Sequence, residues 1–178
     1  MKNLIFLLFI VAGLATFYYA CEAPKSYPNT PEVSFKSILI EDSLDLENPG
    51  NSKKMIKLTI RVVDGNGDIG IVGDNNFIYP GFEDLENRNL FITLYEKIDG
   101  VFVETENELG WNYATPYLEP EGQDKTLKAD IEVSMDINFA FYTYDTIKYS
   151  FYIYDRAKNI SNIGESPEIP ADSLGLIE

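Results

Sequence analysis

The sequence contains no histidine and only one cysteine among its 178 residues. Without histidine, the chain cannot build Ser–His or Cys–His nucleophile pairs or a histidine-ligated metal site. A single cysteine excludes a disulfide within the chain. A pair of carboxylates would still allow glycoside hydrolysis, but among 29 acidic residues no pair is marked by its neighbours. The composition therefore predicts a protein that is not an enzyme.

Basic residues are also scarce, because 14 Lys and Arg face 29 Asp and Glu and leave a net charge of −15. A surface of this sign repels the phosphates of nucleic acids, so we expect no nucleic-acid partner. The same surface attracts divalent cations without specificity.

The N-terminus has the pattern of an export signal. Lys2 is followed by an apolar run from Leu4 to Ala15, and Ala20 directly precedes Cys21. This layout is typical of a secretory signal peptide, whereas a membrane-spanning helix needs about 20 apolar residues. We therefore expect residues 1–20 to be a cleaved signal peptide.

The residues around Cys21 resemble a bacterial lipoprotein signal, in which the cysteine after the cleavage site is acylated. Ala20 fits that motif, whereas Tyr18 stands where the motif usually carries Leu. The resemblance implies that Cys21 is the mature N-terminus and that its acyl chains, such as palmitate, form a stable anchor in the outer membrane. The alternative is ordinary cleavage, which would leave Cys21 as a free thiol.

A tether is expected to separate this anchor from the domain. Pro24, Pro28 and Pro31 follow Cys21 within a few residues, and this spacing forbids helix and favours an extended, solvated chain. Eleven such residues span up to about 35 Å. The predicted organisation is a signal peptide (1–20), a lipidated tether (21–32) and one domain (33–178).

The domain is expected to be all-β. Apolar and polar residues alternate in its strongest segments, and Gly, Pro, Asn and Asp separate these segments. The predicted strands cover residues 33–40, 55–63, 89–98, 101–106, 126–135 and 147–154, with a short last strand within 159–170. Asp99 and Gly100 predict a tight hairpin. Together these features predict an immunoglobulin-like antiparallel β-sandwich of about seven strands. In two strands, one face is expected to carry Ile56, Leu58, Ile60 and Val62, and Ile147, Tyr149, Phe151 and Ile153.

Two segments, 71–89 and 109–122, show no regular pattern and are expected to be long loops. Each holds three aromatic residues, which suit a protein interface or, in the second loop, a sugar-binding platform. The candidate binding residues are Phe77, Tyr79, Phe82, Trp111, Tyr113 and Tyr117. The alternative for the second group is that Trp111 packs against the sandwich and the tyrosines cover its edge.

The stretch VVDGNGDIGI (62–71) places Asp64, Asn66 and Asp68 at alternate positions among glycines. Such oxygen ligands on a turning backbone suit calcium, although Ile69 excludes the helix–loop–helix calcium loop, which needs Gly there. Asp155 ends another strand, and both strands can end at one edge of a sandwich. The four side chains would then converge on one structural calcium ion, with Asp74 as a further candidate ligand. The alternative is that these residues only satisfy the backbone of turns.

DGNGDIG (64–70) resembles the DGDGDIG-type signature of small predicted lipoproteins from Bacteroidota. YDRAKNISN (154–162) resembles the DRAGNxSN pattern that closes many bacterial immunoglobulin-like domains, with Lys158 in place of the usual Gly. The resemblance implies location at the outer membrane and favours the cell surface over the periplasmic face. Glu22 is not followed by further acidic residues, so the side of the membrane stays open.

These features predict a non-enzymatic, lipid-anchored accessory subunit that docks on an outer-membrane protein complex for export, barrel assembly or nutrient uptake. The alternative function is a calcium-stabilised surface module that binds a glycan or another ligand. A hydrolase that uses two carboxylates is the third and weakest hypothesis. No cofactor is expected apart from the structural calcium.

Overall fold

The computed structural model describes residues 26–44, 52–71, 88–105, 111–117, 120, 124–138, 145–170 and 172–178. These residues form ten β-strands, and none of them belongs to a helix that is long and apolar enough to cross a membrane. Several residues singled out in the sequence lie outside the described residues, namely Cys21, Asp74, Phe77, Tyr79 and Phe82.

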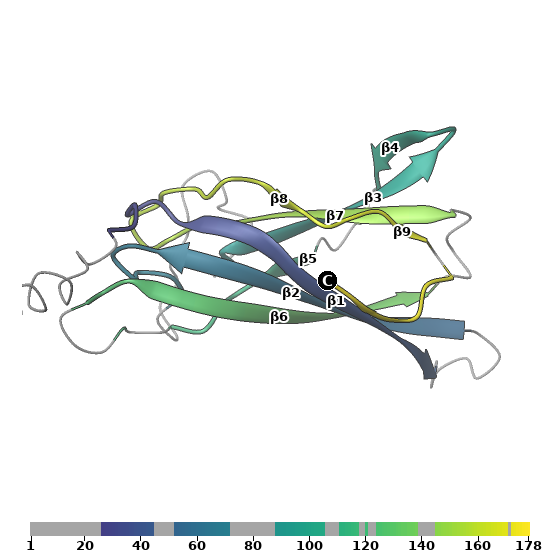
Figure 1. Cartoon of the computed structure of the whole chain (residues 1–178), viewed down its shortest axis with the longest axis horizontal. Helices are drawn as coiled ribbons and strands as arrows, with labels where there is room; N and C mark the ends of the chain where they lie inside the picture. Colours follow the sequence, from purple (N-terminus) through teal and green to yellow (C-terminus); the bar gives the residue numbers. More distant parts are fainter. Residues whose placement is uncertain are drawn as a thin grey trace, which may run out of the picture.

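The strands form two antiparallel sheets (Figure 1). The first sheet has the order β10–β1–β2–β6, with β10 at Gly175–Ile177, β1 at Glu32–Leu44, β2 at Ser52–Asp64 and β6 at Leu127–Asn138. The second sheet has the path β4–β3–β7–β8, with β4 at Val101–Glu104, β3 at Leu90–Ile98, β7 at Thr146–Ile153 and β8 at Gly164–Glu165. Two further strands join it, because β5 (Trp111–Tyr113) pairs with β3 and β9 (Ile169–Pro170) pairs with β7.

One hydrophobic core lies between the two sheets. The inner face of β2 carries four fully buried side chains, Ile56, Leu58, Ile60 and Val62. The inner face of β7 carries Ile147, Tyr149, Phe151 and Ile153, which are also buried in this core. Burial of each such side chain contributes about 1.5–3 kcal/mol. The predicted faces are confirmed, and the fold is the predicted all-β, immunoglobulin-like antiparallel sandwich.

The described residues contain ten strands rather than about seven. Four of them, β5, β8, β9 and β10, have only two or three residues. A segment of that length cannot show a period of two, so its pairing depends on the neighbouring strand. For the same reason the segment 109–122, expected to be a loop, contains β5.

A tight turn at Asp99 and Gly100 joins β3 to β4, as predicted. Their φ angles are 49° and 81°, and a type I′ hairpin turn needs positive φ at both central residues. The β3–β4 hairpin projects from the sandwich at the end opposite to the start of β1 (Figure 1).

The last residues of the expected tether contact the domain. The Tyr27 hydroxyl accepts a hydrogen bond of 2.8 Å from Lys128 Nζ, which also lies 4.2 Å from the centroid of the Tyr27 ring. The Pro28 carbonyl oxygen accepts a hydrogen bond of 2.8 Å from the Gly65 N–H, and Pro31 is buried. Tyr27 and Pro31 are thus partly or fully covered, whereas Pro28, Asn29 and Thr30 are exposed, and the solvated tether over 21–32 stays a prediction.

Candidate functional site

The acidic residues singled out in the sequence meet where β2 and β7 end. Asp64 is the last residue of β2, and Asp155 follows the end of β7 by two residues. Ile69 forms an antiparallel bridge with Asp155, so the loop after β2 runs alongside the segment after β7. This pairing connects the two sheets at the end of the sandwich where β1 begins.

Three carboxylates share a small space at this junction. Asp64, Asp68 and Asp155 each offer one oxygen atom, and these atoms all lie within 4.8 Å of one another. Asp64 and Asp155 are fully buried, whereas Asp68 is half-buried. We call Asp64, Asn66, Asp68 and Asp155 the acidic junction.

Hydrogen bonds satisfy only part of the acidic junction. Asp64 Oδ2 accepts a hydrogen bond of 2.9 Å from the Asp68 N–H, and both oxygens of Asp155 accept bonds of 2.7 Å from Asn159. Three other oxygens, Asp64 Oδ1, Asn66 Oδ1 and Asp68 Oδ1, are buried and have no hydrogen-bond partner among the described residues. A buried polar atom without a partner costs about 1–3 kcal/mol, so three in one loop require a physical explanation.

The electrostatics of the junction point the same way. Burial is the largest cause that raises the pKa of Asp64 to about 6, and the negative charges of Asp68 and Asp155 add to it, although the hydrogen bond from the Asp68 N–H acts in the opposite direction. Burial also raises the pKa of Asp155, with a smaller contribution from Asp68. The salt bridges between described residues lie on other parts of the surface and include none of these three carboxylates. The junction thus concentrates three carboxylates that take part in none of these salt bridges.

Glycines in the same loop allow it to pack tightly. A Cβ atom at Gly65 would lie 2.3 Å from the carbonyl oxygen of Tyr27. Gly67 has a φ of +66°, and its Cβ would lie 2.2 Å from the carbonyl oxygen of Lys125. No other residue fits at either position without moving the backbone. The alternation of glycine and oxygen-bearing residues therefore serves two purposes, close packing on one side and the acidic junction on the other.

The residues after Asp155 fix the backbone around the junction. Ser161 Oγ accepts a hydrogen bond of 3.0 Å from the Ile153 N–H at the end of β7. Asn162 Oδ1 accepts a bond of 2.8 Å from the Val33 N–H, and Asn162 Nδ2 donates one of 2.9 Å to the Val33 carbonyl. Asn162 therefore imitates a strand partner for β1. Nothing local in the segment 154–162 identifies Val33 as the partner of Asn162.

Arg156 is a second residue that the sequence did not single out. Its Nη1 donates a hydrogen bond of 2.9 Å to the Ile69 carbonyl, and its guanidinium lies 4.4 Å from the centroid of the Tyr117 ring. Arg156 thus joins the loop after β2 to the segment after β5. The position of Arg156 next to Asp155 was the only hint in the sequence. The sequence pattern does not distinguish an arginine that binds a backbone carbonyl from one that is solvated.

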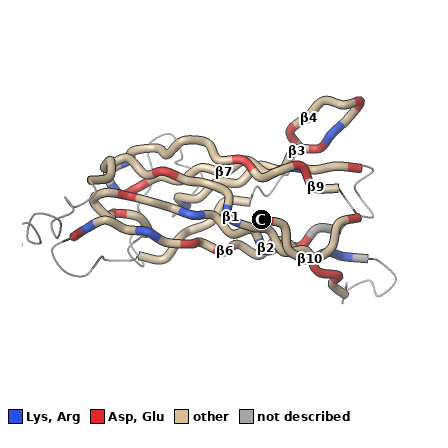
Figure 2. Tube along the Cα trace, viewed as in Figure 1, with Lys and Arg blue, Asp and Glu red and all other residues tan. Residues whose placement is uncertain are grey.

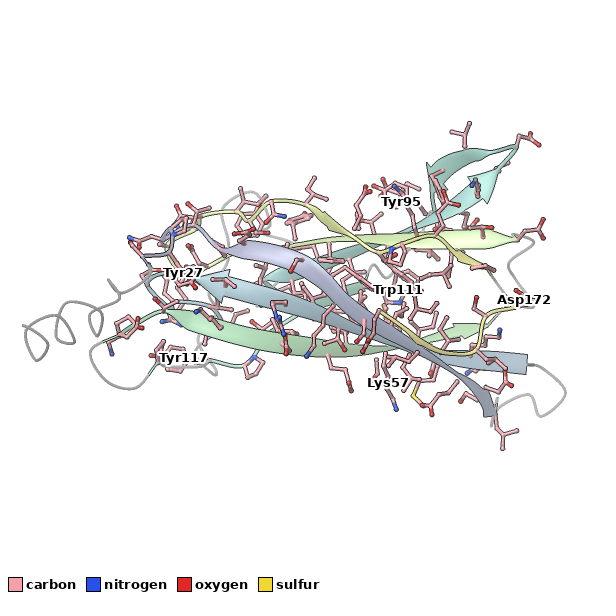
Figure 3. All side chains as sticks on the ribbon, viewed as in Figure 1. Tyr27, Lys57, Tyr95, Trp111, Tyr117 and Asp172 are labelled. Carbon is pink, nitrogen blue, oxygen red and sulfur yellow. The ribbon has the colours of Figure 1, made fainter. Side chains whose placement is uncertain are left out.

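The aromatic candidates of the second loop do not share one exposed face. Trp111 and Tyr113 are half-buried and pack against the core, with the Trp111 ring 6.1 Å from that of Tyr149. Tyr117 is 38% exposed and lies at the same end of the molecule as Tyr27, far from Trp111 (Figure 3). Trp111 and Tyr113 therefore pack against the sandwich, as in the alternative to a binding platform. Of the three aromatic residues, Tyr117 alone lies at the surface.

Another aromatic group lies on the outer face of the second sheet. Phe91 stacks on Tyr152 with ring centroids 5.0 Å apart, and Tyr154 meets both rings edge-on. Phe91 belongs to β3 and Tyr152 to β7, and Tyr154 directly follows β7. The sequence did not indicate this group, because the pairing of β3 with β7 brings it together.

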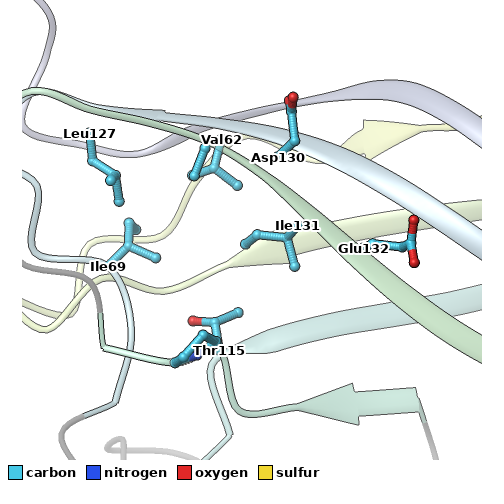
Figure 4. A pocket seen from close by; sticks show the side chains of 9 residues that line it. Val62, Ile69, Thr115, Leu127, Asp130, Ile131 and Glu132 are labelled. Carbon is cyan, nitrogen blue, oxygen red and sulfur yellow. The ribbon is translucent and has the colours of Figure 1, made fainter.

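A pocket of about 210 Å³ opens between β6 and the segment 115–116 (Figure 4). Val62, Ile69, Leu127 and Ile131 give it an apolar lining, and Asp130 and Glu132 stand at its edge. Sites for drug-sized ligands usually enclose about 300–1,000 Å³. The pocket is therefore better explained as the open edge of the sandwich than as a ligand site.

Comparisons with known proteins give no further guide to function. No family model matches the chain, and neither a curated protein nor a solved structure matches it.

Proposed function

We propose that the protein is a non-enzymatic, lipid-anchored accessory subunit that docks on a protein complex of the outer membrane. The lipoprotein-like signal that ends at Cys21 supports the anchor. The observation that carries the docking function is an exposed apolar face on the β3–β4 hairpin.

This face continues the inner side of β3 beyond the core. Side chains directly opposite in an antiparallel pair share a face, and Ile98 pairs with Val101 while Glu96 pairs with Val103. Ile98, Val101 and Val103 are 41%, 64% and 45% exposed. Three apolar, β-branched residues on a projecting hairpin are the composition of an interface core rather than of a solvated turn.

The opposite face of the hairpin is already covered. Lys97 Nζ and Lys148 Nζ lie 5.3 Å and 5.0 Å from the centroid of the Phe102 ring. Cations over an aromatic face are a stable arrangement in water, so this side needs no partner. The hairpin therefore has one finished face and one exposed apolar face, which suits docking against a single partner protein.

The arrangement of the chain also favours docking away from the membrane. Tyr27 lies at the end where the chain enters the domain, whereas the hairpin projects at the opposite end (Figure 3). Acidic residues occur along both sheets (Figure 2), and anionic lipid head groups repel such a surface. A lipid at Cys21 would thus leave the hairpin free to meet a partner protein.

The docking function is tested with the native lipidated protein, extracted in mild detergent and purified by affinity. The hairpin variant carries Ile98→Thr, Val101→Thr and Val103→Thr, which keep β-branched side chains and remove apolar surface. The control carries Leu174→Thr and Leu176→Thr, two other exposed apolar residues. A specific partner should copurify with the wild type and the control but not with the hairpin variant. Equal recovery of one partner with all three proteins would contradict docking through the hairpin.

The anchor is tested separately with Cys21→Ser. The wild-type protein should fractionate with membranes and carry the mass of acyl chains on its N-terminal residue, whereas the variant should lose both properties. A mature wild-type protein that is released into the medium with an unmodified thiol would contradict the anchor.

The glycan-binding alternative has less support from the geometry. It needs several exposed aromatic rings on one surface, but Trp111 and Tyr113 pack against the core. Retardation of the protein on a polysaccharide gel, lost in Tyr117→Ala, would restore this alternative.

A further inference from the structure

We propose that Asp64, Asn66, Asp68 and Asp155 bind one calcium ion that ties the two sheets together where the chain enters the domain. This site does not depend on the docking function, and it lies at the other end of the sandwich from the β3–β4 hairpin (Figure 1).

The spacing of the ligand atoms fits a single ion. Calcium binds six to eight oxygen atoms at 2.3–2.6 Å, so two ligands on opposite sides of the ion lie about 4.6–5.2 Å apart. The three carboxylate oxygens of the acidic junction all lie within 4.8 Å of one another. They can therefore surround one calcium ion without any movement of the strands.

Turn formation explains some oxygens of the junction but not the others. Asp64 Oδ2 and both Asp155 oxygens accept hydrogen bonds from nearby N–H groups, which is the ordinary role of Asp in turns. Asp64 is nevertheless fully buried, and its Oδ1 has no hydrogen-bond partner in the part of the chain that the structure describes. The side-chain oxygens Asn66 Oδ1 and Asp68 Oδ1 are also buried and have no hydrogen-bond partner among the described residues. Three buried oxygen atoms on alternate residues of one loop are therefore available to coordinate a cation.

The chemistry of the donors selects a hard cation. Carboxylate and amide oxygens suit calcium and magnesium, and the chain has no histidine that would favour zinc or copper. Magnesium requires near-ideal octahedral geometry at 2.0–2.1 Å and is reluctant to lose its water. Calcium accepts irregular geometry, which suits ligands supplied by two separate segments. The prediction is therefore stronger binding of calcium than of magnesium.

An ion at this position would join three parts of the chain. Asp64 ends a strand of the first sheet, and Asp155 follows a strand of the second sheet. The Gly65 N–H between the ligands donates to the Pro28 carbonyl in the entering segment. Binding to the folded state alone raises its stability, and ion concentrations about 100 times Kd would raise the melting temperature by roughly 5–10 °C.

The test measures thermal unfolding of the full mature chain, first in chelator and then in excess calcium or excess magnesium. Asp64→Asn and Asp68→Asn keep the shape of the ligands and remove one charge each. The matched control is Asp136→Asn, the same change at an exposed residue of β6. Calcium should stabilise the wild type and the control by several degrees more than magnesium does, and it should not stabilise the two junction variants.

Two outcomes would overturn the site. An unchanged melting temperature of the wild type in calcium and in chelator would leave only an acidic turn. Equal stabilisation of all four proteins would mean non-specific attraction to the acidic surface. Calorimetric titration of the wild-type chain with calcium keeps the proposal testable if a junction variant does not fold. It should show one saturable site with a Kd of about 10⁻³ M or tighter, and no saturable heat would contradict the proposal.

Discussion

The backbone N–H of Arg156 donates a hydrogen bond of 3.0 Å to the carbonyl oxygen of Asp68. This bond joins the loop after β2 to the residue beside Asp155, and it holds two carboxylates together that would otherwise repel each other. Backbone pairing therefore brings the two segments together, and hydrogen bonds from Asp68 and Asn159 orient the carboxylates of Asp64 and Asp155. The carboxylates of such a site are held close together in the absence of a cation. Their effect on the stability of the ion-free protein can therefore be measured.

The first prediction concerns pH. In chelator, the free energy of unfolding should increase as the pH falls from 7 to about 5, because the pKa of Asp64 is raised to about 6 from its ordinary value of 3.8. A raised pKa means that the folded state binds the proton more tightly than the unfolded state does. Stability is then gained as the pH falls through about 6, and it is lost again as the pH rises through the same range.

Urea denaturation at pH 5, 6 and 7 measures this effect. Groups with a lowered pKa do not interfere, since hydrogen bonds from Arg61 and Lys36 hold the pKa of Asp130 at about 2 and its contribution is lost only in stronger acid. Asp64→Asn removes the carboxyl group with the larger of the two raised pKa values and should reduce the slope between pH 5 and 7, while Asp155, whose pKa burial also raises, keeps part of it. A wild-type midpoint that is constant or falls toward pH 5 would contradict the prediction.

The second prediction concerns the contact between Asn162 and Val33. Asn162→Ala removes two hydrogen bonds between β1 and the segment after β7, and it leaves the Val33 backbone groups without these partners. The variant should lose about 1–3 kcal/mol of unfolding free energy. Asn162→Asp keeps the acceptor for the Val33 N–H and loses the donor, so its loss should be smaller when measured by urea denaturation. Equal losses would mean that the hydrogen bond to the Val33 N–H contributes nothing.

These contacts show which parts of the molecule are visible in the sequence. The alternation of β2 and β7 is a local property, so their buried faces could be predicted correctly. The Asp99–Gly100 turn is equally local. Asn162 and Val33 are separated by 129 positions, and no pattern in either segment indicates the other. The short strand β10 depends in the same way on a distant partner, β1, whereas β8 and β9 lie within 159–170, where a short last strand was predicted.

The candidate site follows the same division. Asp64, Asn66 and Asp68 stand out because they alternate among glycines, and Asp155 stands out because it ends a strand pattern. The burial of Asp64 was not visible in the sequence, since Tyr27 and Pro28 pack against Gly65, and Pro120 and Lys125 pack against Gly67. The aromatic residues of β5 show the opposite case, because composition suggested a surface and the pairing with β3 placed two of them against the core.

The third prediction concerns the turn of the β3–β4 hairpin. Gly100 has a φ of +81°, and a Cβ atom there would contact nothing within 4 Å. Gly100→Ala therefore tests backbone conformation alone, and it should cost about 1–2 kcal/mol. Asp99 has a φ of 49°, so Asp99→Gly should be neutral or slightly stabilising. Thermal unfolding of the two variants measures both effects, and a stable Gly100→Ala variant would contradict a left-handed conformation at this position.

The last prediction concerns Lys158, which stands where the resembling pattern has glycine. Its φ is 72°, a conformation that costs a residue with a Cβ atom about 1–2 kcal/mol, whereas glycine adopts it readily. Its backbone N–H donates to the Asp155 carbonyl, and this bond does not depend on the side chain. Lys158→Gly should therefore stabilise the domain by up to about 1 kcal/mol, because the greater flexibility of glycine in the unfolded state offsets part of the gain. Lys158→Ala is the control, since it loses the same charge but keeps the Cβ atom. Urea denaturation should place glycine above alanine, and equal stabilities would show that the turn is not strained.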